Sequence, residues 1–181
     1  MASVFDRQIQ NRNYLSPIGF KFTLAKEPKV TFFSNSARIP EINLMLAKQP
    51  SYLKDIDLPG EKLTYGDFNL RFLVDENLEN YMAIHNWLTG LGFPEITTQY
   101  KDLTTTSVGL RDEKAAFSDG SLRILNSNYK DVAIIKFLDL FPVSLTSLEF
   151  TATDTDINYF TAEVSFKYTV YQILGNDGRP L

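Results

Sequence analysis

Residues 159–171 read YFTAEVSFKYTVY, the most regular pattern in this chain of 181 residues. Apolar or aromatic side chains occupy every second position: Ala162, Val164, Phe166, Tyr168 and Val170. Period-two alternation is typical of a β-strand with one buried face. We therefore predict one strand over Tyr159–Tyr171. At about 3.3 Å per residue it would span ~43 Å, which is long for a lone domain and indicates a strand that extends into a larger assembly.

Shorter runs of the same kind predict further strands. They are Ile18–Leu24, Val30–Phe33, Lys62–Tyr65, Phe68–Val74, Ser121–Leu125, Val132–Leu138 and Leu145–Phe150. Turn residues separate several of them, notably at Pro59-Gly60 and Phe141-Pro142. The pattern predicts a mainly β protein, an antiparallel β-sandwich or barrel with one flanking helix.

The predicted helix follows Asp75, which is well placed as a cap. Apolar positions recur at intervals of three and four residues, at Leu78, Tyr81, Met82, His85 and Leu88. Acidic Glu76 and Glu79 favour a helix N-terminus, and Gly90, Gly92 and Pro94 end the helix.

Other stretches show no clear period. Residues 1–17 form a polar N-terminal arm, 95–120 an excursion over the surface, and 175–181 a flexible C-terminal tail. Residues 38–59 carry three prolines and predict a long connection, which in a compact domain is usually functional or mobile. A single domain is expected over residues 18–174.

Composition narrows the class of protein. Aromatic residues make up 13% of the chain, with 14 Phe and 9 Tyr, which favours sheets and large contact surfaces. The net charge is −4 and no block of Lys or Arg could follow a phosphate backbone, which argues against tight nucleic-acid binding. The absence of cysteine excludes disulfides and thiolate metal sites. No signal peptide or membrane span is predicted, so we expect a soluble protein assembled in the cytoplasm.

Candidate catalytic groups are few. The lone histidine, His85, could act as a general base or metal ligand, but the more economical interpretation is a half-buried core residue with a hydrogen-bond partner. A Ser-His-Asp triad is formally possible, although no Gly-x-Ser-x-Gly elbow singles out a serine.

Carboxylates gather at Asp75-Glu76 and at Asp154-Thr155-Asp156, where a helix cap and a turn explain them more simply than a cation or glycosidase site. Gly90-Leu91-Gly92 follows a helix rather than opening one, the wrong context for a phosphate loop. Trp87 is expected in the core. We predict no catalytic residue, metal site or cofactor, and therefore a structural subunit that assembles with copies of itself.

Three stretches, taken in order, resemble a known family. They are Phe20–Phe22 leading into Ala37–Pro40, then Leu58–Glu76 followed by Trp87, and finally Leu140–Ser144 with the alternating strand to Tyr171. This order and spacing resemble the tail tube proteins of T4-like contractile-tailed bacteriophages. The chain departs from the family pattern in its polar N-terminal arm and its longer stretch 95–130.

The resemblance implies rings of six copies that join their sheets into one inner barrel and stack into a tube through which DNA passes. The implied partners are further copies, sheath and baseplate proteins, and DNA in transit, with no membrane. The implied location is the virion tail, after assembly in the host cytoplasm. The segment Ile39–Asp57 would contact the next ring, with Lys48, Tyr52, Lys54 and Asp55 as predicted contact residues.

A bore that conducts DNA must avoid holding it, and six copies at −4 give −24 per ring. Glu163, on the polar side of the last predicted strand, is the predicted bore-facing residue. Alternatives are a tube initiator or baseplate-proximal ring, an effector-delivery tube of the type VI kind, and an enzyme of β-sandwich fold.

Overall fold

A computed structural model describes residues 15, 17–26, 34–92, 116–151 and 159–180. Within those residues the chain forms nine strands and one helix. They are β1 (Phe20–Leu24), β2 (Ser34–Arg38), β3 (Ile42–Gln49), β4 (Ile56–Tyr65), β5 (Phe68–Leu73), α2 (Glu79–Gly92), β6 (Ser118–Leu125), β7 (Asp131–Leu145), β8 (Thr161–Lys167) and β9 (Val170–Gly175). All strand pairs are antiparallel, which confirms the predicted mainly β class with one helix.

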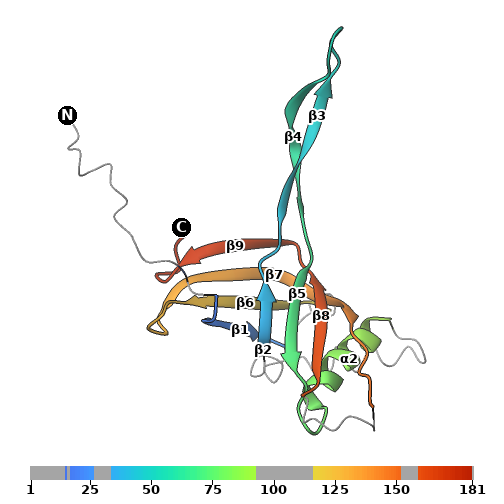
Figure 1. Ribbon diagram of the computed structural model, residues 1–181, viewed down its shortest axis with the longest axis vertical. Coiled ribbons are helices and arrows are strands. Elements are labelled where there is room, and N and C mark those ends of the chain that lie inside the picture. The colour runs from blue at the N-terminus through green and yellow to red at the C-terminus, as the bar shows by residue number, and fades with distance from the viewer. Residues whose placement is uncertain (1–14, 16, 27–33, 93–115, 152–158, 181) are drawn as a thin grey trace, which may run out of the picture.

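The main sheet has seven strands in the order β1-β6-β7-β8-β5-β2, with β9 also on β7. Strand β7 is 15 residues long and divides the sheet. Its residues 131–140 pair with β6 and β9, and its residues 141–145 pair with β8. We call β1, β6, β7 residues 131–140 and β9 the first half-sheet, and β7 residues 141–145 with β8, β5 and β2 the second half-sheet. The two run across one another in Figure 1.

The sheet turns a corner between its halves. Asp139 has a φ of 54°, a left-handed conformation that Asp tolerates better than most residues, and Thr169 N donates to Leu138 O at 3.0 Å. On the facing strand, β8 ends at Lys167 and β9 begins at Val170. The predicted single strand Tyr159–Tyr171 is therefore wrong, because the alternation continues through a bend. Its length gives no sign of assembly, since both pieces pair with β7.

Two further predictions fail along β7. Phe141-Pro142 was expected to be a turn, but both residues lie inside the strand, and the predicted strand Leu145–Phe150 is wrong because β7 ends at Leu145. Pro142 is tolerated there because the register shifts between Pro142 and Ser144, at a bulge that needs no donor from proline.

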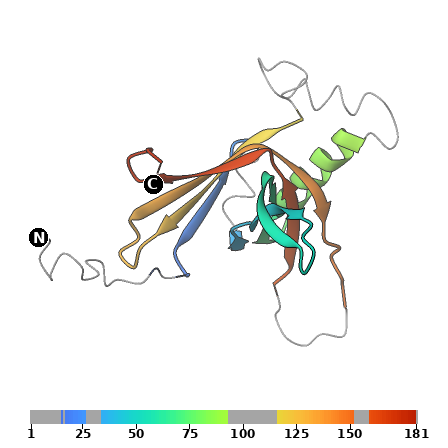
Figure 2. The ribbon, with the colours of Figure 1, turned by 90° about the horizontal axis from the view of Figure 1, so that it is seen from above.

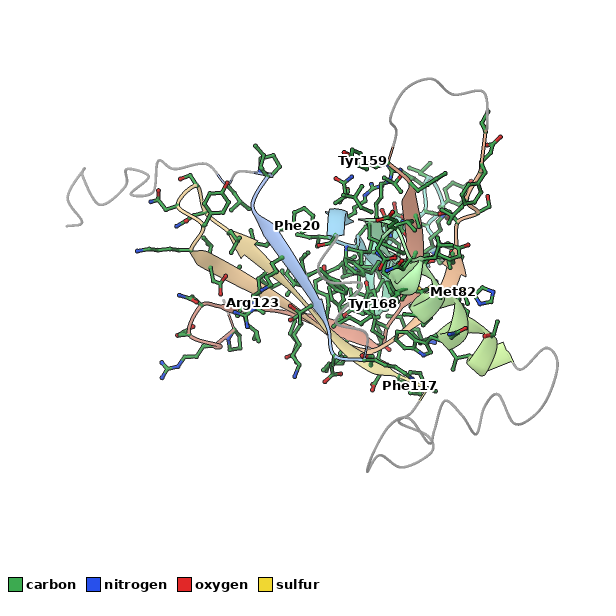
Figure 3. The ribbon with its side chains drawn as sticks, turned by 90° about the horizontal axis from the view of Figure 1, so that it is seen from below. Phe20, Met82, Phe117, Arg123, Tyr159 and Tyr168 are labelled. Atoms are coloured by element: carbon green, nitrogen blue, oxygen red, sulfur yellow. The ribbon has the colours of Figure 1, made fainter. Side chains whose placement is uncertain are left out.

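The core lies between the half-sheets and is rich in phenylalanine. Phe68 is fully buried, with ring centroids 4.5 Å from Phe137 and 5.2 Å from Phe22. Trp87 of α2 contacts Phe166 of β8, so the helix closes one side of this core. Figure 2 shows α2 beside the second half-sheet, and Figure 3 shows side chains crowded between them.

The helix exists as predicted, but a different face is buried. Asn80, Ile84, Trp87 and Gly90 face the core, whereas His85 and Met82 are exposed, and Figure 3 shows Met82 on the outer side of α2. Leu78 precedes the helix with a φ of 58°, and Asp75 lies four residues before Glu79, too far to be its cap. Asn80 holds the entry instead: its side chain donates to Leu73 O at 2.7 Å and accepts from Asp75 N.

At the C-terminal end, the segment predicted to be flexible begins with the last residue of β9. Gly175 N donates to Arg179 O at 2.7 Å, and Pro180 bridges back to Leu174. The predicted strand Val30–Phe33, the Asp154–Asp156 turn, and most of the 1–17 arm and of the 95–120 excursion lie outside the described residues. In the described part of the chain, no helix has the length and apolarity that crossing a membrane requires.

Candidate assembly surface

Strands β3 and β4 form a two-stranded ribbon that stands away from the rest of the molecule (Figure 1). We call residues 42–65 the arm. The predicted unstructured connection over residues 38–59 is therefore wrong, since it holds β3 and the start of β4. Every residue of β3 is exposed, and β4 is nearly so. The sequence pattern missed β3 and the start of β4, because a ribbon that is exposed on both faces has little buried surface to produce an alternating pattern.

The arm carries an unusual number of exposed apolar side chains. They are Ile42, Leu44, Met45, Leu46, Tyr52, Leu53, Ile56, Leu58 and Leu63. Near the body they share one face, because Ile42 lies opposite Tyr65 and Leu44 opposite Leu63. The other face there is polar, with Asn43 opposite Thr64. Contiguous exposed apolar surface of this kind marks a protein contact.

A bulge divides the arm into a near and a far part. Leu44 pairs with Leu63, but Leu46 pairs with Pro59, so one residue of β3 faces three of β4. At this point the backbones approach so closely that a Cβ on Gly60 would lie 2.1 Å from Met45 O. The predicted turn at Pro59-Gly60 is therefore wrong as a chain reversal. Proline and glycine are suited to the bulge instead, where one removes a donor and the other a side chain.

The predicted contact residues all lie at the far end of the arm. Lys48 is near the end of β3 and lies opposite Asp57, while Tyr52, Lys54 and Asp55 are in the connection to β4. All are exposed, and Tyr52 has a relative exposure of 101%. The tip therefore presents an aromatic ring and charges of both signs to its surroundings.

Two tyrosines from the sheet corner hold the root of the arm. Tyr171 Oη donates to Pro40 O at 3.3 Å, just before β3, and Tyr168 Oη donates to Gly66 O at 2.9 Å, just after β4. Gly66 N donates to Glu41 O at 3.0 Å and closes the ribbon between them. Nearby, Lys167 forms an ion pair with Asp67.

The rings of these tyrosines belong to an aromatic cluster. Tyr65 lies 6.1 Å from Tyr168 and 5.6 Å from Tyr171, and Phe137 lies 5.1 Å and 5.9 Å from them, all between ring centroids. Burial, with smaller contributions from Tyr171, Tyr65 and Asp67, raises the pKa of Tyr168 well above its usual value. Burial, and to a smaller extent the neighbouring Tyr65, also raises the pKa of Tyr171. Both hydroxyls therefore keep the proton that they donate. Both residues lie in the strand predicted over Tyr159–Tyr171, but the sequence pattern indicates no role for them.

The first half-sheet ends in strands with one partner each. Among the described residues, β1 pairs only with β6, and β9 only with β7. The charges on its strands balance: Lys21, Arg123 and Lys136 against Asp119, Asp131 and Asp139. Arg123 and Asp131 form an ion pair at 2.8 Å. This face therefore has no surplus of either sign.

Glu163, the predicted bore-facing residue, lies on β8 in the second half-sheet. It faces Arg71 of β5 across the sheet, with Arg71 Nη2 3.2 Å from Glu163 Oε2. Its backbone N donates to Thr146 Oγ1 at 2.8 Å.

The candidate chemical groups that the structure describes are His85 and the carboxylates of Asp75 and Glu76, while Asp154–Asp156 lie outside the described residues. His85 is exposed on α2, so its predicted half-buried position is wrong, because the helix buries the neighbouring stripe. Across the described segments, no three His, Cys, Asp or Glu residues come together as metal ligands would.

Comparison with known proteins gives a clear family match. A family model described as phage tail tube protein matches residues 2–174. No curated protein matches the chain.

Several solved structures share the fold over nearly the whole chain. The anti-feeding prophage cap (AFP tube terminating cap) contains a chain with a TM-score of 0.65 and 16% identity, covering 96% of this chain and 99% of that one. The PVC sheath/tube terminator of an extracellular contractile injection system gives 0.59 and 18%, with 91% and 100% covered. The PVC sheath-tube complex in the extended state gives 0.58 and 15%, with 97% and 99% covered.

Proposed function

This chain belongs to the phage tail tube protein family and is a structural tube subunit of a phage-tail-like particle, and we propose that six copies close into a ring and that rings stack into the tube. The observation that carries this proposal is a combination of two features: a half-sheet whose outer strands, β1 and β9, each pair with one other described strand, and an apolar arm that no other element of the described chain covers. One feature closes rings and the other joins them.

Ring closure follows from the edges of the first half-sheet. An exposed strand edge carries unpaired N–H and C=O groups, and closing a ring removes every such edge. With β9 of one copy beside β1 of the next, six four-stranded half-sheets would form one barrel of 24 strands. The balanced face of that half-sheet would then line the bore, where DNA passes without being held. Glu163 lies on the second half-sheet, so its predicted place in the bore requires that half-sheet to face inward instead.

The arm supplies the contact between rings. The apolar face near the root of the arm is extensive enough to need a protein partner. In a tube built from copies of one chain, that partner is a second copy of this chain. Lys48, Tyr52, Lys54 and Asp55 at the tip would then meet the neighbouring ring. The exposed tip suits this role because it can enter a partner without disturbing its own subunit.

The remaining partners follow from the similar particles. One similar chain is part of a structure described as a sheath-tube complex, and another is part of a structure described as a baseplate. For this chain we propose a sheath around the tube and a baseplate at its end. Assembly in the host cytoplasm and the absence of enzymatic activity belong to the same proposal. A ring at one end of the tube is the second candidate, because two of the similar structures are described as a cap and a terminator. Counting copies of this chain against the sheath protein in purified particles separates the two.

Negative-stain microscopy of the purified chain over a range of concentrations tests the proposal. We expect six-fold rings or tubes at high concentration. Deleting Lys48–Lys54 should leave the circular dichroism spectrum of the sheet intact while stopping stacking, because no other described strand pairs with the far part of the arm. A chain that stays monomeric at every concentration contradicts the proposal, and loss of the fold on deletion would show that the arm belongs to the core.

A further inference from the structure

We propose that Tyr168 and Tyr171 act as a clasp that fixes the direction of the arm and so positions it for assembly. The inference deepens the proposed function, on which its assembly part rests. Neither tyrosine lies on the arm itself. Both lie at the corner of the main sheet, where β8 gives way to β9, and Figure 3 shows Tyr168 there in the middle of the molecule.

The need for a clasp comes from how the arm is attached. Within the described residues, β3 and β4 pair with each other and with no other strand. The ribbon joins the body through two short links, residues 39–41 before it and residues 66–67 after it. A two-stranded ribbon on two such links can pivot about its root unless further contacts hold both links.

Each link is held by one of the two tyrosines. Tyr171 donates its hydroxyl proton to Pro40 O in the first link, and Tyr168 donates to Gly66 O in the second. Pro40 is buried, so its carbonyl needs a partner, and no other hydrogen bond to it is found among the described residues. Two bonds at two points fix a direction, which one bond at one point would not do.

The clasp is rigid because its own side chains are held by their rings. Both rings pack against Phe137, a fully buried residue of β7, and against Tyr65 at the end of β4. Removing a hydroxyl while keeping the ring therefore separates the direction of the arm from the packing of the core. Tyr→Phe changes are the sharpest test for this reason.

The direction of the arm matters for stacking, because all copies in a ring must place their arms against the next ring at the same time. A pre-organised element binds more tightly than a mobile one, since less freedom is lost on contact. The effect is multiplied when several contacts must form together. We therefore expect loss of both hydroxyls to raise the concentration needed for assembly by about tenfold or more, with no change of fold.

The test measures the direction of the arm separately from assembly. The chain has no cysteine, so Lys54→Cys at the tip and Asn86→Cys on α2 place two spin labels and no others. Labelled chains diluted with unlabelled ones give the distance distribution by double electron–electron resonance. We expect one narrow distribution in the parent and a clearly broadened one in the Tyr168→Phe/Tyr171→Phe double variant. Sedimentation of the same proteins without labels gives the assembly concentration.

Tyr81→Phe is the matched control, because Tyr81 Oη also donates to a backbone carbonyl, Thr146 O at 3.1 Å, but away from the arm. It should change neither readout. If the double variant unfolds, the same two measurements are made on the single variants Tyr168→Phe and Tyr171→Phe. A distribution as narrow in the double variant as in the parent overturns the clasp. A broadened distribution with unchanged assembly overturns the positioning role. A parent that never assembles overturns the proposed function, while the distances still decide the clasp.

Discussion

Replacing Gly60 by alanine should disable the arm while sparing the body. A Cβ at this position would lie 2.1 Å from Met45 O and 2.8 Å from Met45 C, and real Cβ atoms essentially never come within 3.0 Å of such atoms. Both are backbone atoms, so no side-chain rotation relieves the clash. The two strands must separate by about 0.9 Å, the difference between 2.1 and 3.0 Å. Ladder hydrogen bonds of about 2.9 Å do not survive that separation.

The expected cost is large for the arm and small for the protein. Forcing an extra methyl group into a tight contact costs about 1–3 kcal/mol. An isolated two-stranded ribbon is itself only marginally stable, so this cost exceeds what holds the far part of the arm together. The free energy of unfolding of the body should change by less than about 0.5 kcal/mol, because no other described strand pairs with β3 or β4.

Hydrogen–deuterium exchange, chemical denaturation and sedimentation together check this prediction. In Gly60→Ala we expect faster amide exchange over residues 46–59, an unchanged denaturation midpoint and loss of assembly. Gly92→Ala is the control, because a Cβ there meets nothing within 4 Å. Parent-like exchange and assembly in Gly60→Ala would refute the reasoning, and so would a large fall in the stability of the body.

Three further predictions concern the body. Phe68→Ala should lower the free energy of unfolding by about 3–5 kcal/mol, because Phe68 is fully buried. Phe150 is 70% exposed, so Phe150→Ala should lower it by less than about 1 kcal/mol. Equal effects of the two changes in guanidinium titrations would contradict the core described above. Burial raises the pKa of Tyr168 above its usual 10.0, so the folded state favours the neutral phenol. The free energy of unfolding should therefore be constant below pH 10 and fall as the pH rises above it. Tyr168→Phe should make this fall less steep, and the same pH dependence in the variant and the parent would contradict the prediction. In assembled tubes, Lys136→Cys should be shielded from a bulky maleimide and Glu163→Cys should react; the reverse pattern would place the second half-sheet in the bore.

Sequence reasoning succeeded where side chains are buried on one face. The strands predicted over Ile18–Leu24 and Phe68–Val74 contain β1 (Phe20–Leu24) and β5 (Phe68–Leu73), since one side of each strand packs into the core. The helix was found from its spacing, but two stripes competed for the core. The position of Trp87 against Phe166 decided between them, and that contact joins residues far apart in the chain.

Local turn rules failed at two prolines for a shared reason. Pro59 and Pro142 both lie inside strands, each beside a shift of register. A bulge and a chain reversal use the same residue types. Both contain positions that need no N–H donor, which suits proline, and positions with an unusual backbone conformation, which suits glycine. Which of the two forms depends on whether a partner strand lies alongside, and a local pattern does not contain that information.

The sequence by itself determined the class of this protein: a mainly β chain with one helix, in an order of segments that resembles tail tube proteins. Burial of alternate side chains is a local property, and it is written directly in the order of residues. Only the tertiary structure decided that residues 42–65 stand out as an arm, that the segment after residue 160 turns a corner between β8 and β9, and that Tyr168 reaches back to Gly66 and Tyr171 to Pro40. An exposed ribbon leaves no burial pattern, a bend preserves the alternation on both sides, and a hydrogen bond across 102 or 131 residues depends on the whole fold.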